Sequence, residues 1–214
     1  MTRIVTTTIF ALDELSDDAR NKARAWYREG AFDHDWHEFV YEDFERVCAI
    51  IGIELQTVPV RLYGGGTRKK TCIWYSGFWS QGDGACFEGA YSYCANAHRA
   101  IRDYAPQDLE LHRIADALRQ VQRRNFYQLH AHARHRGHYY HEHCMAISVE
   151  RDSPTDQDMT VDAEDAVIEA LRHLARWLYR QLEREYSYQT SDTVVDEAIL
   201  ANEYTFTASG RRFG

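Results

Sequence analysis

The sequence predicts an α+β protein in which an antiparallel sheet of about five or six strands carries helices packed largely on one face. Two observations predict this class. Segments typical of strands occur as consecutive hairpins at 71–93 and 127–149, and the longest helical pattern follows the second hairpin. The regular alternation of strand and helix that marks a doubly wound parallel sheet is absent.

The first predicted element is a strand over 4–10, where β-branched residues dominate. Ser16 is expected to cap the helix that follows, because Asp17 and Asp18 then lie in its first turn, where the helix dipole favours negative charge. Apolar residues at helical spacing predict a second helix over 35–51. Gly52 is expected at its C′ position.

The remaining elements follow from the same patterns. A strand is predicted over 53–62, and the three glycines and three cations of 64–70 indicate a mobile connection. Further on, we expect hairpin strands at 71–79 and 85–93, a helix at 109–124, hairpin strands at 127–135 and 138–149, helices at 162–186 and 192–201, and a terminal strand at 204–207.

Length and composition predict one domain over 1–214, because 214 residues with 44% apolar and 27% charged residues are typical of a globular domain. The amino-terminal residues lack the pattern of a signal peptide, and no run reaches the ~18 apolar residues of a membrane helix. The five cysteines are odd in number and form no C-x-x-C pair, which favours reduced thiols in a cytoplasm.

The net charge of −8 argues against nucleic acid as the main partner, because phosphate binding needs a basic surplus. An acidic protein suits a basic protein surface instead. Two local basic features remain: the segment 64–70, and the solvent-facing side of the helix at 109–124, with Arg113, Arg119, Arg123 and Arg124. Such a row is usually a solvated helix face.

Four histidines offer one candidate metal site. If Arg136-Gly137 is a two-residue turn, His132 faces His141 and His130 faces His143 on one side of the second hairpin. Imidazole ligands suit Zn, Cu, Fe and Ni. The alternative, which we favour, is a solvated or packed strand face without metal, because the site depends on the register and no carboxylate on that face orients the rings.

The segment 76–89 is the second candidate, since its glycines permit close backbone approach. Asp83 and Glu88 are candidate acid and base groups, and Cys86 is a candidate nucleophile. The segment matches neither a P-loop nor a dinucleotide fingerprint. A tight hairpin with packed aromatics is the simplest interpretation. A recognition loop is the functional one, with Phe78, Trp79, Gln81, Asp83 and Glu88 as its expected contact residues.

A third candidate lies near the start of the second helix, where four side chains have spacings that metal ligands use: His34, His37, Glu38 and Glu42. Any polar helix face has the same spacings, and the pattern is not H-E-x-x-H. We therefore expect a polar face here.

Several stretches of the chain resemble a family of proteins encoded by bacteriophages and prophages. These are LSDDAR at 15–20, AWYR at 25–28, SGF at 76–78, QGDGACFEG at 81–89, LEREY at 182–186, NEYTFT at 202–207 and GRRF at 210–213. Members of that family are often labelled antitoxins of toxin–antitoxin systems. The resemblance implies a phage accessory protein in a bacterial cytoplasm, and it supplies no catalytic residues.

The sequence therefore favours a phage-encoded binding protein that inhibits or redirects a host factor, with an antiphage defence complex as the expected target. One alternative is an antitoxin that neutralises a cognate toxin. The other is a metal-dependent enzyme built on His130, His132, His141 and His143. For the binding protein we expect no cofactor, no metal, no catalytic residue and no membrane partner. The partner is then a host or phage protein, and a homo-oligomer formed with a second copy of the chain is an alternative.

Overall fold

The computed structural model describes residues 6–32 and 35–214, and its contacts divide the chain into two compact units. The larger unit is Phe39–Glu183, and the smaller combines Met1–Glu38 with Arg184–Gly214. The single domain over 1–214 stays a prediction. Two compact units form one domain if they fold cooperatively, and the contacts do not test this.

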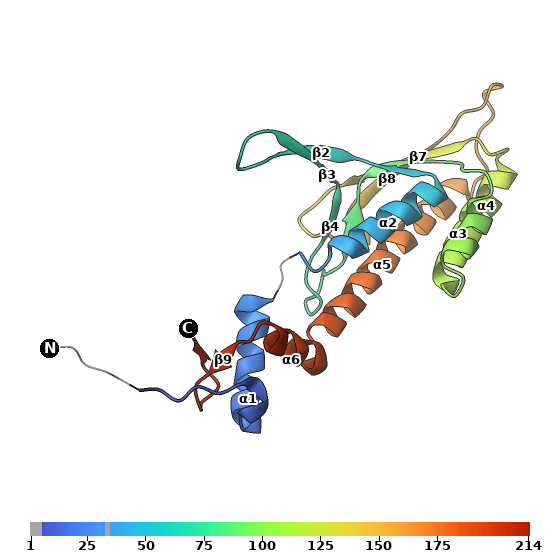
Figure 1. Cartoon of the computed structure of the whole chain (residues 1–214). Coiled ribbons are helices and arrows are strands. Elements are labelled where there is room, and N and C mark those ends of the chain that lie inside the picture. The colour runs from blue at the N-terminus through green and yellow to red at the C-terminus, as the bar shows by residue number, and fades with distance from the viewer. Residues whose placement is uncertain (1–5, 33–34) are drawn as a thin grey trace. The chain divides into compact units, whose positions relative to one another are not determined.

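Across the described residues the protein is α+β, with six α-helices and antiparallel strand pairs throughout (Figure 1). The predicted class is therefore confirmed. The predicted sheet size is wrong, because the largest sheet has four strands in the order β1 (Ile53–Leu55), β6 (Gly89–Ser92), β7 (Leu129–His135) and β8 (Met145–Arg151). The other described strands form three two-stranded ribbons, β2-β3, β4-β5 and β9-β10.

The sheet is smaller because strands that the sequence presents as continuous change partners midway. The predicted strand 53–62 is divided into β1 (Ile53–Leu55) and β2 (Thr57–Arg61), and 85–93 into β5 (Ala85–Phe87) and β6 (Gly89–Ser92). At the break, Gln56 N donates to Glu88 O (2.8 Å), Cys72 N to Gln56 O (2.8 Å) and Glu88 N to Cys72 O (2.9 Å). β1 thus pairs with β6, while β2 pairs with β3 (Thr67–Thr71) and β4 (Ile73–Tyr75) with β5.

One face of the four-stranded sheet belongs to the core of the larger unit. In β7 (Leu129–His135), Leu129, Ala131 and Ala133 are buried and alternate with more exposed residues. The row Ile53, Tyr91, Ala131 and Val149 crosses all four strands, including β8 (Met145–Arg151), and each member is buried. Figure 1 shows α2 (Glu38–Ile51) and α5 (Ala163–Gln189) along this side of the sheet.

Most helices lie where the apolar spacing predicts them. These are α2 (Glu38–Ile51), α4 (Leu109–Arg124) and α5 (Ala163–Gln189), which belong to the larger unit except for Glu38 and residues 184–189. The carboxylate of Asp108 caps α4 by accepting from the amides of Glu110 and Leu111 (3.1 and 3.0 Å). One helix, α3 (Ala97–Tyr104), was not predicted, because Ile101 is its one buried residue and leaves no apolar stripe.

The smaller unit has a core of its own. Both ends of the sequence contribute to it: α1 (Asp17–Trp26) with α6 (Asp192–Ala201), β9 (Thr205–Phe206) and β10 (Arg212–Phe213). Its buried residues are Leu12, Leu15, Ala19, Ala23, Val195, Ile199 and Phe206. Ser16 stands at the N-cap position of α1, as predicted, although its side chain makes no capping bond.

The strand predicted over 4–10 is not formed in the described residues. Residues 1–5 lie outside them, and 6–9 have no regular structure. Phe10 forms an isolated bridge with Phe206, with N–O distances of 2.8 and 2.9 Å. Measured for length and apolar character, none of the described helices is able to cross a membrane.

Candidate functional site

The loop 76–84, which joins β4 to β5, is held in one conformation by its own side chains. The amides of Trp79 and Ser80 both donate to Oδ2 of Asp83, at 2.9 and 2.6 Å. Ser76 N donates to Gly84 O at 3.0 Å and closes the loop. Asp83 is therefore a positioning residue for the loop, because its carboxylate is occupied by two backbone donors.

Glycines let this loop pack closely on the connection 136–144, which joins β7 to β8. A Cβ at Gly84 would lie 2.8 Å from Cδ2 of His141 and 3.1 Å from the carbonyl oxygen of Tyr140. At Gly82 the backbone has φ +95°, and a Cβ would touch the ring of Tyr139 at 3.4 Å. A larger residue at Gly84 would push the two segments apart.

An aromatic anchor ties the loop to α5. The Phe78 ring stacks on Tyr75 with centroids 5.9 Å apart and lies 5.5 Å from the ring of Tyr179. The Tyr179 hydroxyl donates to Gly77 O at 3.1 Å. Phe78 is thus half-buried, whereas Trp79 is 79% exposed and Gln81 is also exposed. The loop is anchored by one aromatic residue and presents the next one to solvent.

The catalytic alternative for this segment does not fit its geometry. Cys86 is fully buried, and this burial, with the nearby Cys144 and Glu88, raises the pKa of its thiol to about 12. A buried thiol of that kind is a poor nucleophile at neutral pH. Glu88 accepts a hydrogen bond from the amide of His135 at 3.0 Å, so its carboxylate supports β7. All five cysteines have free thiols in the structure, and their reduced state in the cell stays a prediction.

The predicted four-histidine face is wrong, because β7 and β8 pair in another register. His130 faces Glu150 and His132 faces Ser148, while His135 faces Met145. The connection is therefore the nine-residue segment 136–144 and not a turn at Arg136-Gly137. His141 and His143 lie within this connection, where His143 belongs to a short 3-10 helix, Glu142–Cys144. The enzyme built on these four histidines loses its structural basis.

Within the described residues, one group of His, Cys, Asp or Glu side chains is close enough to share a metal ion: His141, Glu142 and His143, with ligand atoms within 4.8 Å of one another. The Glu142 carboxylate already has a cationic partner, since Nε of Arg176 lies 2.9 Å from its Oε1. Nδ1 of His141 lies 3.2 Å from Oε2. A divalent ion here would face the guanidinium of Arg176, so this group fits a structural ion pair better than a metal site.

The Glu142–Arg176 pair makes stability depend on pH. Burial acts to raise the pKa of Glu142, but hydrogen bonds from its own backbone amide and from Arg176 prevail and lower that pKa. The folded state therefore holds the proton less tightly than the unfolded state. The stabilisation is complete above the ordinary value of about 4.5 and is lost as the pH falls through the lowered folded pKa.

We expect Glu142→Gln to lower the free energy of unfolding by about 1–3 kcal/mol at pH 7, and the difference from the parent to shrink as the pH falls below about 5. Urea unfolding at a series of pH values measures both effects. Glu110→Gln is the matched control, because the exposed Glu110–Arg180 pair is worth about 0–1 kcal/mol. A difference for Glu142→Gln that does not change with pH would contradict the ion-pair role.

The other predicted clusters are not formed as sites. His34 lies outside the described residues, and the ring of His37 packs edge-on against Trp36 with centroids 5.7 Å apart. α2 begins at Glu38, so Glu38 and Glu42 are exposed residues of its first turns. In the described part of the chain, none of these side chains joins a group able to share an ion.

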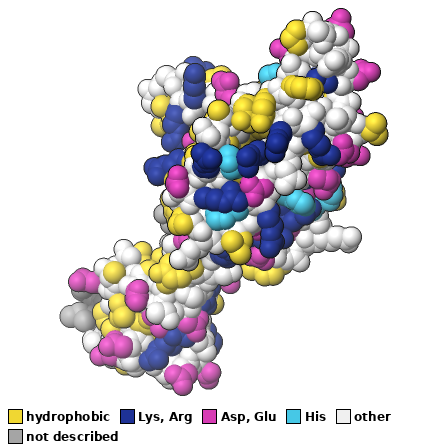
Figure 2. Space-filling model, turned by 90° about the vertical axis from the view of Figure 1, so that its right-hand side faces the viewer, with side chains coloured by type: hydrophobic (Ala, Val, Ile, Leu, Met, Phe, Trp, Pro, Cys, Tyr) yellow, Lys and Arg dark blue, Asp and Glu magenta, His cyan; other side chains and the backbone are white. Residues whose placement is uncertain are grey.

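The basic row of α4 is part of a surface of mixed charge. Arg124 pairs with Asp162 at 2.8 Å, and on the neighbouring α3 Arg102 pairs with Asp116 at 2.6 Å. Figure 2 shows Asp and Glu side chains among the Lys and Arg side chains of the face it displays. The row is a solvated helix face. The segment 64–70 does not join it, because this segment forms the turn and second strand of the β2-β3 ribbon.

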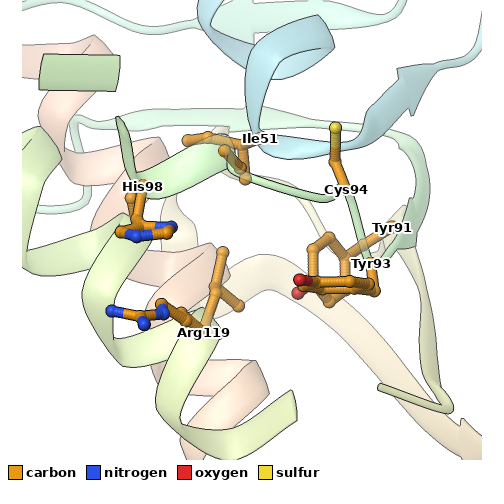
Figure 3. Close-up of a pocket in the computed structure, with 9 residues that line it drawn as sticks. Ile51, Tyr91, Tyr93, Cys94, His98 and Arg119 are labelled. Atoms are coloured by element: carbon orange, nitrogen blue, oxygen red, sulfur yellow. The ribbon is translucent and has the colours of Figure 1, made fainter. Parts of the chain in front are cut away.

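A small cavity lies where the end of β6 meets α3 and α4 (Figure 3). Tyr91, Tyr93, Cys94, His98 and Arg119 line it together with four apolar residues. Partial desolvation, followed by the charges of Arg119 and Arg99, lowers the pKa of His98. The volume is about 10 Å³, which is at the lower limit for one water molecule, so the cavity has no room for a substrate.

Sequence reasoning missed one feature that supports the loop. The rings of Trp74 and Tyr140 stack with centroids 6.0 Å apart, and His135 lies 5.9 Å from Trp74 and 5.2 Å from Tyr140. This stack fixes the connection 136–144 against β4. The aromatic residues of 138–140 were a signal, but the assumed strand register placed them on a sheet face instead.

Comparison with known proteins identifies a family without assigning an activity. The family model described as "Domain of unknown function (DUF8835)" matches residues 36–192, which include the whole larger unit. No curated protein matches the chain, and no solved structure matches it. Because the family model covers most of its length, the chain belongs to the DUF8835 family.

Proposed function

We propose that the protein acts by stoichiometric binding of another protein, with the loop 76–84 as its contact surface. The observation that carries this proposal is the exposure of Trp79, which is 79%. The loop around it is ordered, because the carboxylate of Asp83 accepts hydrogen bonds from two of its backbone amides. Tryptophan is enriched among the residues that dominate binding energy. A loop that is already ordered loses little conformational entropy on binding.

The residues of the loop divide into contacts and supports. Trp79 and Gln81 are exposed and are the proposed contacts. Phe78 and Asp83 stabilise the loop. The ring of Phe78 stacks on Tyr75, and the carboxylate of Asp83 accepts hydrogen bonds from two backbone amides. Glu88, expected from the sequence as a contact, is engaged with the amide of His135 and is a support of the sheet.

The proposed partner is a host protein, with an antiphage defence complex as the first class to examine. This step rests on the resemblance to phage-encoded proteins, which also supports a bacterial cytoplasm as the place of action. The net charge of −8 suits a partner with a basic surface, since complementary fields speed association. An antitoxin would bind a cognate toxin instead, so the identity of the captured protein separates the two.

We expect Trp79→Ala to weaken partner binding by about 30-fold or more, which is the loss of a hot-spot residue worth about 2 kcal/mol. The immobilised full chain is used to capture proteins from a bacterial lysate, and the dissociation constant for the captured partner is then measured by calorimetry. Because Trp79 is exposed, the variant should unfold at nearly the same urea concentration as the parent.

Tyr188→Ala is the control, because Tyr188 is 60% exposed and belongs to the smaller unit. It removes an exposed aromatic ring that is not part of the loop and should leave the dissociation constant unchanged. A partner held equally well by Trp79→Ala and by the parent would show that the loop is not the contact surface.

A further inference from the structure

The β2-β3 ribbon has no role in the core. All five residues of β2 and four of the five in β3 are exposed. At its tip, residues 62–66 form a turn closed by Leu62 N donating to Gly66 O at 3.1 Å, and Tyr63 is fully exposed. An isolated two-stranded ribbon is marginally stable in water. Because this ribbon adds nothing to the core, we look for a function in binding.

The ribbon carries only positive charge. Between residues 57 and 71 there are Arg61, Arg68, Lys69 and Lys70 and no Asp or Glu. None of these four cations forms an ion pair within the part of the chain that the structure describes. With four positive charges here and −8 for the whole chain, the remaining residues carry −12. The ribbon is therefore a basic projection from an acidic protein.

The cations are distributed over both faces of the ribbon. Val58 pairs with Lys70 across the ribbon, and Val60 pairs with Arg68, so Arg68 and Lys70 lie on the same face. Pro59 faces Lys69 and Arg61 faces Thr67, which places Arg61 and Lys69 on the other face. A flat anionic surface, such as a membrane or an acidic protein face, would engage one of these faces. An anion that lies on both sides of the ribbon would engage both.

We propose that the β2-β3 ribbon binds double-stranded DNA by entering the major groove. That groove is about 12 Å wide and admits a two-stranded β-ribbon, with phosphates along both of its walls. The major groove of an RNA duplex is too narrow and deep for side chains to read. The cations contact phosphates, so the binding depends little on base sequence.

The rigid base of the ribbon supports this role. Cys72, directly after β3, is buried, and its amide donates to Gln56 O at 2.8 Å. Gln56 N in turn donates to Glu88 O at 2.8 Å. Both strands are thus fixed where they join the rest of the larger unit. This proposal is independent of the protein-binding loop, and either can fail without the other.

The test measures binding of the full chain to a fluorescent DNA duplex of about 30 base pairs, by anisotropy between 50 and 200 mM salt. Each of two double variants removes the two cations of one face: Arg68→Gln with Lys70→Gln, and Arg61→Gln with Lys69→Gln. The parent should show a log–log salt slope of up to about −3.6, which corresponds to four phosphate contacts. Each pair should flatten that slope by about 2 and weaken binding about tenfold or more at 50 mM salt.

The matched control is Arg113→Gln with Arg123→Gln, two exposed cations of α4, and it should change the slope by much less. Circular dichroism checks that every variant is folded. The proposal is overturned if the duplex does not bind at 50 mM salt, if the control pair acts as strongly, or if only one face of the ribbon matters. It is also overturned if vesicles with anionic lipids bind through the same cations while DNA does not.

Discussion

Replacing Phe44 by Ala is expected to lower the free energy of unfolding of the larger unit by about 3–5 kcal/mol. Phe44 lies on α2 with no exposed surface, and its ring is 5.4 Å from that of Phe87 on β5 and stacks on Trp177 of α5 at 6.4 Å. One side chain therefore joins two helices and a strand. Its removal leaves a cavity that three separate elements would have to close.

Urea unfolding followed by tryptophan fluorescence measures the loss, because Trp177 reports on the same contacts. Phe39→Ala is the control on the same helix, since Phe39 is 51% exposed and its loss should cost less than about 1 kcal/mol. Equal losses for the two variants would mean that α2 does not bury the face that carries Phe44.

Gly52→Ala is expected to lower the free energy of unfolding by about 2–5 kcal/mol. Gly52 ends α2 with φ +98°, a conformation that residues with a side chain rarely adopt. A Cβ there would lie 2.3 Å from the carbonyl oxygen of Ser92, a backbone atom of β6. The substitution therefore adds a clash with the sheet to the strain of the backbone.

Gly65→Ala separates these two contributions. Gly65 has φ +88°, but no heavy atom lies within 4 Å of the position of its Cβ. It should cost no more than about 1–2 kcal/mol, the price of the left-handed conformation alone. If chemical denaturation gave the same loss for both variants, the close approach of α2 to β6 at Gly52 would be wrong.

Local signals in the sequence were sufficient for most helices. α4 and α6 have the predicted bounds, and α2 ends at Ile51 with Gly52 after it, as the apolar spacing and the glycine indicated. These features depend on residues within one or two turns of each other. α3 lacked such a signal because it buries only Ile101.

Strand pairing was harder because it depends on residues distant in sequence. The sequence predicts a two-residue turn at Arg136-Gly137, whereas the structure has the nine-residue connection 136–144 between β7 and β8. The stack of Trp74 on Tyr140 and the close approach of Gly84 to His141 hold this connection outside the sheet. Both contacts come from a segment more than 50 residues earlier, and no local pattern shows them. Only half of the β2-β3 ribbon was predicted. β2 lies within the predicted strand 53–62, whereas most of β3 lies in the segment 64–70, whose glycines and cations indicated a mobile connection.

The candidate loop could be predicted in part. Its glycines and aromatic residues indicated a recognition loop, and the structure places Trp79 and Gln81 at its surface. Spacing alone did not show that Asp83 is used by backbone amides or that Phe78 rests on Tyr179, which lies about 100 residues later. Exposed and buried members of one loop therefore look alike in the sequence.

The divided origin of the smaller unit has a consequence for synthesis on the ribosome. Its core joins Leu12, Ala19 and Ala23, which are made before the larger unit, to Val195 and Phe206, which are made after it. At a rate of ~5–20 residues per second, α1 waits roughly 10–35 s for the strands and helix that cover it. During that interval the larger unit emerges complete, while the apolar side of α1 stays exposed on the nascent chain. Chaperones that bind apolar helices would find their substrate in α1.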